Sequence, residues 1–213
     1  MGVTNLRIAL VDVAERSMVL SLASECTYCI IPSYREDVMA WIKMKHAHLI
    51  STVQTFSSNA VRHNPGMAGV LSLKKIDSTL WSNRVSYDAT DSTDFPRETL
   101  ERCDQVILHK RCFDPFEEPR VDRVLTESVA DEFILIGALT EGAVRATALG
   151  LLRREKVVTV LTDAIGSYDE KEAKLALRYM WAKGAKLSDT ETLLSSSAVR
   201  LVRKQSSPIL DRE

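Results

Sequence analysis

The feature that most constrains the fold is an alternation of short apolar segments with amphipathic segments along the chain. Residues 6–13 form an apolar run of strand length, which is typical of a central strand buried on both faces. Further strands are predicted over residues 48–55, 104–110, 132–137, 156–162 and 185–188. Helices are predicted over residues 33–45, 119–130, 142–154 and 168–183. This order predicts an α/β fold, a doubly wound three-layer αβα sandwich with a central, mostly parallel sheet.

One part of the chain lacks this alternation. Residues 57–96 are rich in Ser, Asn, Asp and Gly, and we expect an excursion with one short helix there. Before it, Ser33 and Glu36 have capping-box spacing, which predicts a helix start at Ser33. We find no internal repeat and no linker that would divide the chain. The expected organisation is a single domain over residues 1–195, followed by a polar tail over residues 196–213.

Composition narrows the classes of partner. The 213-residue chain has a formal net charge of -1, so nothing in its electrostatics favours nucleic acid or an anionic membrane. No apolar run approaches the roughly 18 residues of a membrane span, and the N-terminal apolar segment is not followed by a small-residue cleavage site. We therefore expect a cytoplasmic protein whose partner is a small-molecule substrate.

The cysteines could indicate a metal. Cys26 and Cys29 form a Cys-x-x-Cys pair, but Cys103 and Cys112 are separated by eight residues and no His-x-x-x-His pattern follows. Reduced, partly buried thiols are the better interpretation. We expect neither a metal nor another cofactor.

Three places on the chain are candidates for a ligand site, because ligands of open parallel sheets bind at the carboxyl ends of the strands. These are Asp12, Lys110 and the turn over residues 138–143. The turn runs directly from an apolar strand into an apolar helix. Its backbone N–H groups and the positive helix end suit an oxyanion or a carboxylate. The alternative is a plain helix start with small residues for close packing.

The order and spacing of several motifs resemble the isochorismatase-like cysteine hydrolases. The first strand ends IALVDV, which contains Asp12, and the middle strand ends in VILHKRCFDPF, which contains Lys110. The segment IGALTEGAVRATALGLL, with Thr140, is similar to the strand, turn and helix that carry the family's nucleophile, and VLTDAIGS fits the next strand. The resemblance covers residues 6–55 and 97–193.

The resemblance implies roles for these residues. Asp12 would be the general acid or base, with Lys110 as the cation that keeps its carboxylate ionised. Ala143 stands at the position of the family's nucleophilic cysteine, so a thioester route is closed to this chain. Cys112 is the only cysteine near the site, and nothing in the sequence positions it at the turn. Thr140 is a still weaker candidate nucleophile.

The turn itself would bind the substrate. Family members often have a non-proline cis peptide here, which would fall between Ala138 and Leu139. The N–H groups of Leu139 and Ala143 would then face one oxyanion position, and Thr140 and Gly142 would complete the substrate-binding turn. The Asp-x-His pattern of metal-binding nicotinamidases is absent around His46, His48 and His63, which agrees with the expectation that there is no metal.

Three functions remain open. The chain could be a cysteine-independent hydrolase, as in the isochorismatase branch, where an aspartate protonates a vinyl ether and water completes the hydrolysis. It could be a family member that has lost catalysis and binds a ligand or partner. Ala143 could also be an engineered replacement of a cysteine in an ordinary amidase. An open polar pocket would favour chemistry, and a pocket filled by Met18, Leu20 or Phe113 would favour loss of function. The family resemblance also predicts a homo-oligomer.

Overall fold

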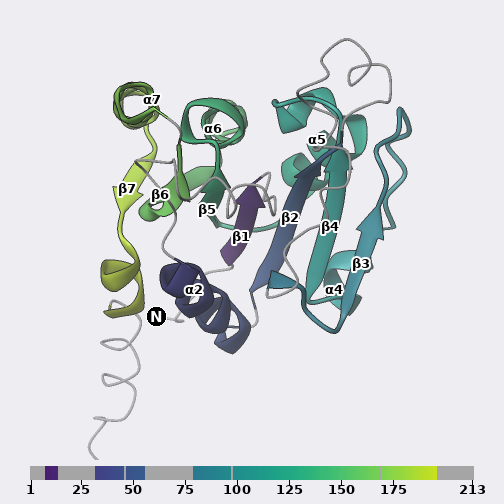
Figure 1. Ribbon diagram of the computed structural model, residues 1–213. Helices are drawn as coiled ribbons and strands as arrows, with labels where there is room; N and C mark the ends of the chain where they lie inside the picture. Colours follow the sequence, from purple (N-terminus) through teal and green to yellow (C-terminus); the bar gives the residue numbers. More distant parts are fainter. Residues whose placement is uncertain are drawn as a thin grey trace, which may run out of the picture.

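The computed structural model describes residues 8–13, 32–45, 47–55, 79–96, 98–167 and 169–195, with residues 12 and 32–36 described by their backbone alone. In this part of the chain seven strands form one sheet in the order β3-β4-β2-β1-β5-β6-β7 (Figure 1). The strands are β1 (Ile8–Val13), β2 (His48–Gln54), β3 (Arg84–Tyr87), β4 (Gln105–Lys110), β5 (Glu132–Ala138), β6 (Val157–Gly166) and β7 (Lys186–Ser188). Every neighbouring pair is parallel.

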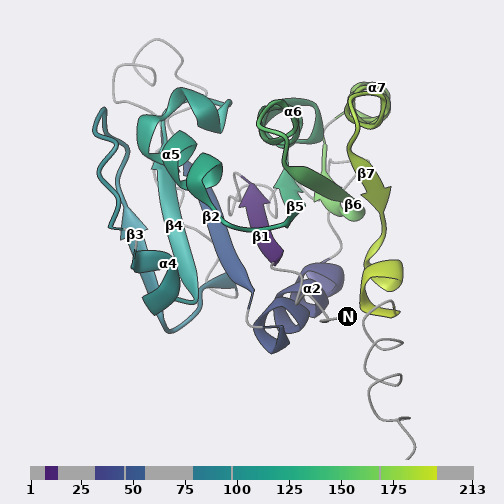
Figure 2. The ribbon, with the colours of Figure 1, turned by 180° about the vertical axis from the view of Figure 1, so that it is seen from behind.

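Helices cover both faces of the sheet, which confirms the predicted three-layer α/β architecture (Figures 1 and 2). They are α2 (Pro32–Met44), α4 (Thr99–Arg102), α5 (Pro119–Glu127), α6 (Arg145–Arg153) and α7 (Glu170–Ala182), with a 3-10 turn η4 (Pro115–Glu117) and a π turn η5 (Thr140–Val144). Residues 190–195 are also helical. One face of the sheet packs on α2, and the other packs on α5, α6 and α7.

The two cores follow from the alternation of side chains along each strand. Leu10 and Val11 are both fully buried, yet Leu10 belongs to the core under α2 and Val11 to the core under the other helices. Successive residues of a strand point to opposite faces, so a central strand covered on both sides must be apolar throughout. This explains why residues 6–13 read as a continuous apolar run.

The region that sequence reasoning described least well contains an additional strand. Instead of a loop with one short helix, β3 pairs in parallel with β4 at the edge of the sheet, and α4 follows it. β3 is four residues long and its side chains alternate between exposed and half-buried. A segment this short and polar shows little periodicity of apolar residues in the sequence. Its strand conformation is stabilised by pairing with β4. The predicted excursion before residue 79, Cys26, Cys29 and the predicted tail lie outside the described residues.

Smaller differences concern element ends. The first described helix begins at Pro32, one residue before the predicted cap at Ser33, because proline is well suited to the first helical position. β6 continues to Gly166, beyond the predicted residue 162, with a register shift opposite Leu135 and Gly137 of β5.

The middle of the sheet is the point where the strand order reverses. From β1 the chain builds β2, β4 and β3 on one side and β5, β6 and β7 on the other. β1 and β5 approach closely at Gly137, where φ is +118° and a Cβ atom would lie 2.2 Å from the carbonyl oxygen of Val13. Only glycine fits there, and a sheet of this kind binds ligands beside such a reversal.

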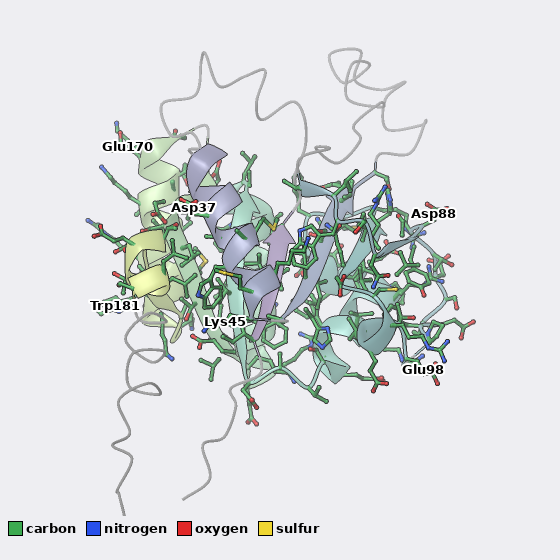
Figure 3. All side chains as sticks on the ribbon, turned by 90° about the horizontal axis from the view of Figure 1, so that it is seen from below. Asp37, Lys45, Asp88, Glu98, Glu170 and Trp181 are labelled. Atoms are coloured by element: carbon green, nitrogen blue, oxygen red, sulfur yellow. The ribbon has the colours of Figure 1, made fainter. Side chains whose placement is uncertain are left out.

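Seen from below, the two ends of the sheet are marked by labelled side chains (Figure 3). Glu170 and Trp181 of α7 lie at one end, and Asp88 and Glu98, near β3 and α4, lie at the other. In the described part of the chain, no helix combines the length and apolar character needed to cross a bilayer.

Candidate functional site at the carboxyl edge of the sheet

The register of the strands brings the predicted site positions to one edge of the sheet, the upper edge in Figure 1. Asp12 lies opposite Ser51 of β2 and Ile136 of β5, next to the point where the strand order reverses. Lys110 ends β4, opposite Gln54 of β2. The turn over residues 138–143 follows β5. The side chain of Asp12 lies outside the described residues.

Lys110 has a fully buried side chain, although lysine is a strongly hydrated cation. Its Nζ donates hydrogen bonds to the carbonyl oxygens of Cys112, at 2.7 Å, and Phe113, at 3.0 Å. Burying an ammonium group is costly unless its donors are satisfied. These two bonds therefore fold the segment after β4 back over the end of its own strand and fix the ammonium group at this edge.

The turn after β5 has the geometry that the family resemblance implied. The peptide bond between Ala138 and Leu139 is cis, as predicted. The carbonyl oxygen of Leu139 then accepts hydrogen bonds from the N–H groups of Gly142 and Val144, both at 3.1 Å. Gly142 departs from helical geometry with φ −107° and ψ −106°. The regular helix α6 begins at Arg145, three residues after the predicted start near residue 142, because the π turn η5 precedes it.

Side-chain hydroxyl groups tie this turn to its surroundings. Thr140 Oγ1 donates to the carbonyl oxygen of Gly166 at 3.0 Å, and Thr147 Oγ1 donates to that of Ala143 at 2.7 Å. Both threonines are fully buried. The hydroxyl of Thr140 thus holds β6 against the turn, and this engagement makes it a poor nucleophile.

The nucleophile position offers no side-chain chemistry. Ala143 is buried, and its methyl group belongs to the core under α6. Cys112 is half-buried and lines the cleft with Gly142 and Ala146, the neighbours of this position, but its thiol is not activated. A hydrogen bond to Glu117, together with burial, raises the pKa of Cys112. Because the thiolate is the reactive form, Cys112 is a weaker nucleophile than an ordinary cysteine.

An open cleft of about 600 Å³ lies between the segment after β4 and the turn after β5. It is lined by Gln54, Arg111, Cys112, Phe113, Asp114, Glu117, Gly142, Arg145 and Ala146. The Phe113 side chain approaches Gly142, yet Phe113 is 56% exposed and forms a wall of the cleft without filling it. Met18 and Leu20, the other residues considered as plugs, lie outside the described residues.

Gln54 is a site residue that sequence reasoning missed. It is 4% exposed, and its Nε2 donates to the carbonyl oxygen of Arg111 at 3.5 Å. Its Oε1 is the buried side-chain polar atom without a hydrogen-bond partner in the part of the chain that the structure describes. The available signal was position, because Gln54 is the polar last residue of a buried strand at the ligand edge.

Charged groups in the cleft differ in how well they are paired. Arg111 donates to Glu118 through Nε at 3.0 Å and to Asp91 through Nη2 at 2.7 Å, and these bonds raise its pKa further. Asp114 accepts from the N–H of Phe116 at 3.0 Å. Arg145 is exposed at the start of α6, and no carboxylate among the described residues forms an ion pair with it.

No group of three or more His, Cys, Asp or Glu residues is arranged to hold a metal within residues 8–13, 32–45, 47–55, 79–96, 98–167 and 169–195. His48 begins β2 and so lies at the amino edge of the sheet, away from the cleft. His46 and His63 lie outside the described residues. The absence of a metal and of other cofactors stays a prediction.

Comparison with known proteins agrees with this geometry. The family model described as the isochorismatase domain matches residues 36–192. A cysteine hydrolase from Pseudomonas syringae pv. phaseolicola is similar in structure, with a TM-score of 0.67, 15% identity, and coverage of 92% of this chain and 94% of that one. The nicotinamidase of Staphylococcus aureus has a TM-score of 0.61 and 15% identity, covering 87% of this chain and 98% of its own.

A third solved structure is relevant to assembly. An octameric hydrolase of unknown specificity from Escherichia coli has a TM-score of 0.57 and 18% identity, with coverage of 86% of this chain and 74% of that one. At these identities the structural likeness concerns the fold. No curated protein sequence matches the chain significantly.

Proposed function

Because the chain belongs to the isochorismatase domain family, we propose that it is a hydrolase that acts on a small carboxylate- or amide-bearing substrate without a cysteine nucleophile. The observation that carries this proposal is the open cleft beside the turn that contains the nucleophile position, with Gln54 in its wall, whose buried Oε1 has no hydrogen-bond partner among the described residues. An unsatisfied buried acceptor costs about 1–3 kcal/mol. A ligand with a hydrogen-bond donor would remove that cost.

In this proposal Asp12 is the general acid or base. Lys110, whose ammonium group is buried at the same edge, keeps the Asp12 carboxylate ionised and oriented. With an amide substrate, Asp12 takes a proton from water as the water oxygen attacks the carbonyl carbon, and then delivers a proton to the leaving nitrogen. With a vinyl ether, Asp12 in its protonated form delivers its proton to the terminal carbon, and water adds to the resulting oxocarbenium ion and returns a proton to Asp12. The hemiketal then collapses, its C–O bond breaks, and a ketone and an alcohol are released.

The turn after β5 stabilises negative charge in the same scheme. The N–H groups of Leu139 and Ala143 would donate to the oxyanion that forms during water attack, and Gly142 leaves room for the substrate beside them. Ala143 has no nucleophilic side chain, so water takes the role that a thiolate has in a cysteine amidase. The predicted roles of Leu139, Thr140 and Gly142 rest on the family resemblance together with this placement.

A second function is favoured by one observation. The Ala143 methyl group is part of the apolar core and Cys112 is not activated, so a binding protein that has lost catalysis would have the same nucleophile position. An engineered replacement of a cysteine would have it as well. The open cleft and the buried Lys110 favour the hydrolase over the binding protein.

We further propose a homo-oligomer, acting in the cytoplasm on a small molecule. The octameric structural neighbour supports the oligomer. So do three large apolar side chains of α7 that are exposed in the single chain, namely Leu175, Tyr179 and Trp181. Exposed apolar surface of this kind is typical of protein contacts.

The test measures hydrolysis of isochorismate and of a panel of small amides by the unmodified chain and by two variants. Asp12→Asn should lower kcat/KM by about 100-fold or more, because general acid–base catalysis contributes 10²–10⁴-fold. Ala143→Cys should create or increase amidase activity, because it supplies the missing nucleophile. The assay follows pyruvate for isochorismate and ammonia for the amides.

A matched control is Asp37→Asn, which removes the same charge from an exposed position on α2. It should leave activity unchanged. Activity that appears only in Ala143→Cys would show a scaffold that lacks its nucleophile, and would contradict the cysteine-independent hydrolase. Inactivity of every variant on the whole panel would support the binding protein.

A further inference from the structure

We propose that Arg145 forms the anion subsite of the cleft and that the preferred ligand is a small monocarboxylate carrying a hydrogen-bond donor that reaches Gln54. This inference rests on the proposed function for its site but concerns which molecules the cleft binds. It identifies a residue outside the Asp12, Lys110 and Ala143 positions as the determinant of ligand charge.

The first step is the placement of Arg145. It is the first residue of α6, directly after the π turn, and it lines the cleft together with Gly142 and Ala146. Its side chain is exposed.

The second step is the pairing of the other charges. Arg111, the other cation in the cleft wall, is neutralised by Glu118 and Asp91. The two carboxylates of the cleft wall keep most of their negative charge, because Asp114 lies 3.9 Å from an exposed Arg153 and Glu117 bonds only the neutral thiol of Cys112. Arg145 forms no ion pair with a carboxylate of the described residues. One positive charge in the cleft is therefore available to a ligand.

The third step is a buried polar group in the wall of the cleft, Gln54, that lacks a hydrogen-bond partner for one of its atoms. The Gln54 side chain is buried, with 4% of it exposed. Its Nε2 donates to the carbonyl oxygen of Arg111, while its Oε1 has no partner among the described residues. An amide oxygen accepts hydrogen bonds and cannot donate them. The ligand group that meets Gln54 is therefore a donor, such as an amide NH₂ or a hydroxyl.

Together these steps define the ligand's charge. A single guanidinium matches one carboxylate, and arginine binds carboxylates through two parallel hydrogen bonds. Asp114 and Glu117 in the same wall would repel a second negative charge. The cleft therefore favours a monoanion over a dianion such as phosphate, and over a neutral diamide.

The test uses binding of matched probes to the full chain, measured by calorimetry or by ligand-observed NMR. Succinamate carries one carboxylate and one amide, succinamide is its neutral analogue, succinate is the dianion, and inorganic phosphate represents other anions. The unmodified chain should bind succinamate more tightly than the other three. Arg145→Gln should weaken succinamate binding about tenfold or more, because hydrogen bonds to charged groups are strong, while succinamide binding changes less than twofold.

A matched control is Arg178→Gln, which removes the same charge from an exposed position on α7 and should leave every affinity unchanged. Arg145→Lys should restore part of the succinamate affinity. Equal losses for succinamate and succinamide, tighter binding of phosphate than of succinamate, or no binding of succinamate by the unmodified chain would each overturn the inference. Ammonia release is assayed in parallel, so that selective binding without turnover would reject the hydrolase while leaving the anion subsite in place.

Discussion

The two walls of the cleft are stabilised by different kinds of interaction. The segment over residues 110–118, after β4, is held by charges, with Lys110 donating to two carbonyl groups and Arg111 joining Glu118 to Asp91. The turn over residues 138–145, after β5, is held by a compact backbone and by buried hydroxyl groups. The first wall places paired charges, and the second places peptide groups beside a buried methyl, with the unpaired cation Arg145 at its end.

This difference separates two tasks. A wall built from small residues fixes the position of its peptide groups with few side chains that could move, as oxyanion stabilisation requires. In a wall built from paired charges, substitution of one charged residue can alter which ligands the cleft binds, provided that its anchor, the buried residue that holds the other charges in place, is kept. Glu118 is that anchor, because it is buried and accepts from Arg111 and from the N–H of Thr90.

The largest effect is expected from removing the anchor of the charged wall. Glu118→Ala would leave the Arg111 guanidinium and two backbone N–H groups without their buried acceptor. We expect the free energy of unfolding to fall by about 3 kcal/mol, measured by urea denaturation. Glu127→Ala is the control, because this exposed i,i+4 partner of Arg123 should change stability by less than about 0.5 kcal/mol. Equal effects of the two substitutions would show that the charged wall has no buried anchor.

An intermediate effect is expected from overpacking behind the small-residue wall. A Cβ atom on Gly150 of α6 would lie 1.9 Å from the ring of Phe116. Gly150→Ala should therefore lower the free energy of unfolding by about 2 kcal/mol, although alanine favours helices. The double variant Gly150→Ala with Phe116→Leu should recover part of the loss, and a double-mutant cycle measures the coupling. Additive effects would contradict direct packing.

The smallest effect concerns the reactivity of the Cys112 thiol, which lies in the charged wall. The hydrogen bond to Glu117 raises the pKa of Cys112, so the thiolate is scarce at neutral pH. Glu117→Gln removes that negative charge and should shift the pH midpoint of Cys112 alkylation downward. Peptide mapping after iodoacetamide treatment at several pH values follows Cys112, with Cys103 as the internal control. An unchanged midpoint for Cys112 would show that Glu117 does not hold the thiol.

Sequence reasoning succeeded where one feature dominated locally. The apolar run before residue 13 predicted β1 because a strand covered on both faces needs no polar alternation. The strand and the helix over residues 132–153 were predicted from their apolar pattern, and the cis peptide between Ala138 and Leu139 was implied by the family resemblance and is present. The parallel sheet followed from the order of these elements, and the structure shows every described pair to be parallel.

Features that depend on distant partners were not predicted. β3 is too short and too exposed to be recognised without β4 beside it. From the sequence, Gln54 was one more residue of a β-branched strand. That it lines a cleft and has an unpaired Oε1 could be recognised only from the structure. Arg145 read as a helix residue for the same reason. The roles of Asp12, Lys110, Leu139, Thr140, Gly142 and Ala143 stay predictions, and the Asp12 and Ala143 variants above test two of them.

The position of β1 in the middle of the sheet has a consequence for synthesis on the ribosome. Its residues pair with β5, where Ile8 lies opposite Glu132, so most of the chain must be made before β1 can be covered on both edges. At translation rates of about 5–20 residues per second, this interval is on the order of ten seconds. During it an apolar strand has an unpaired edge, which is a template for aggregation. Nascent chains of this protein are therefore expected to depend on chaperones, and slower translation should increase that dependence.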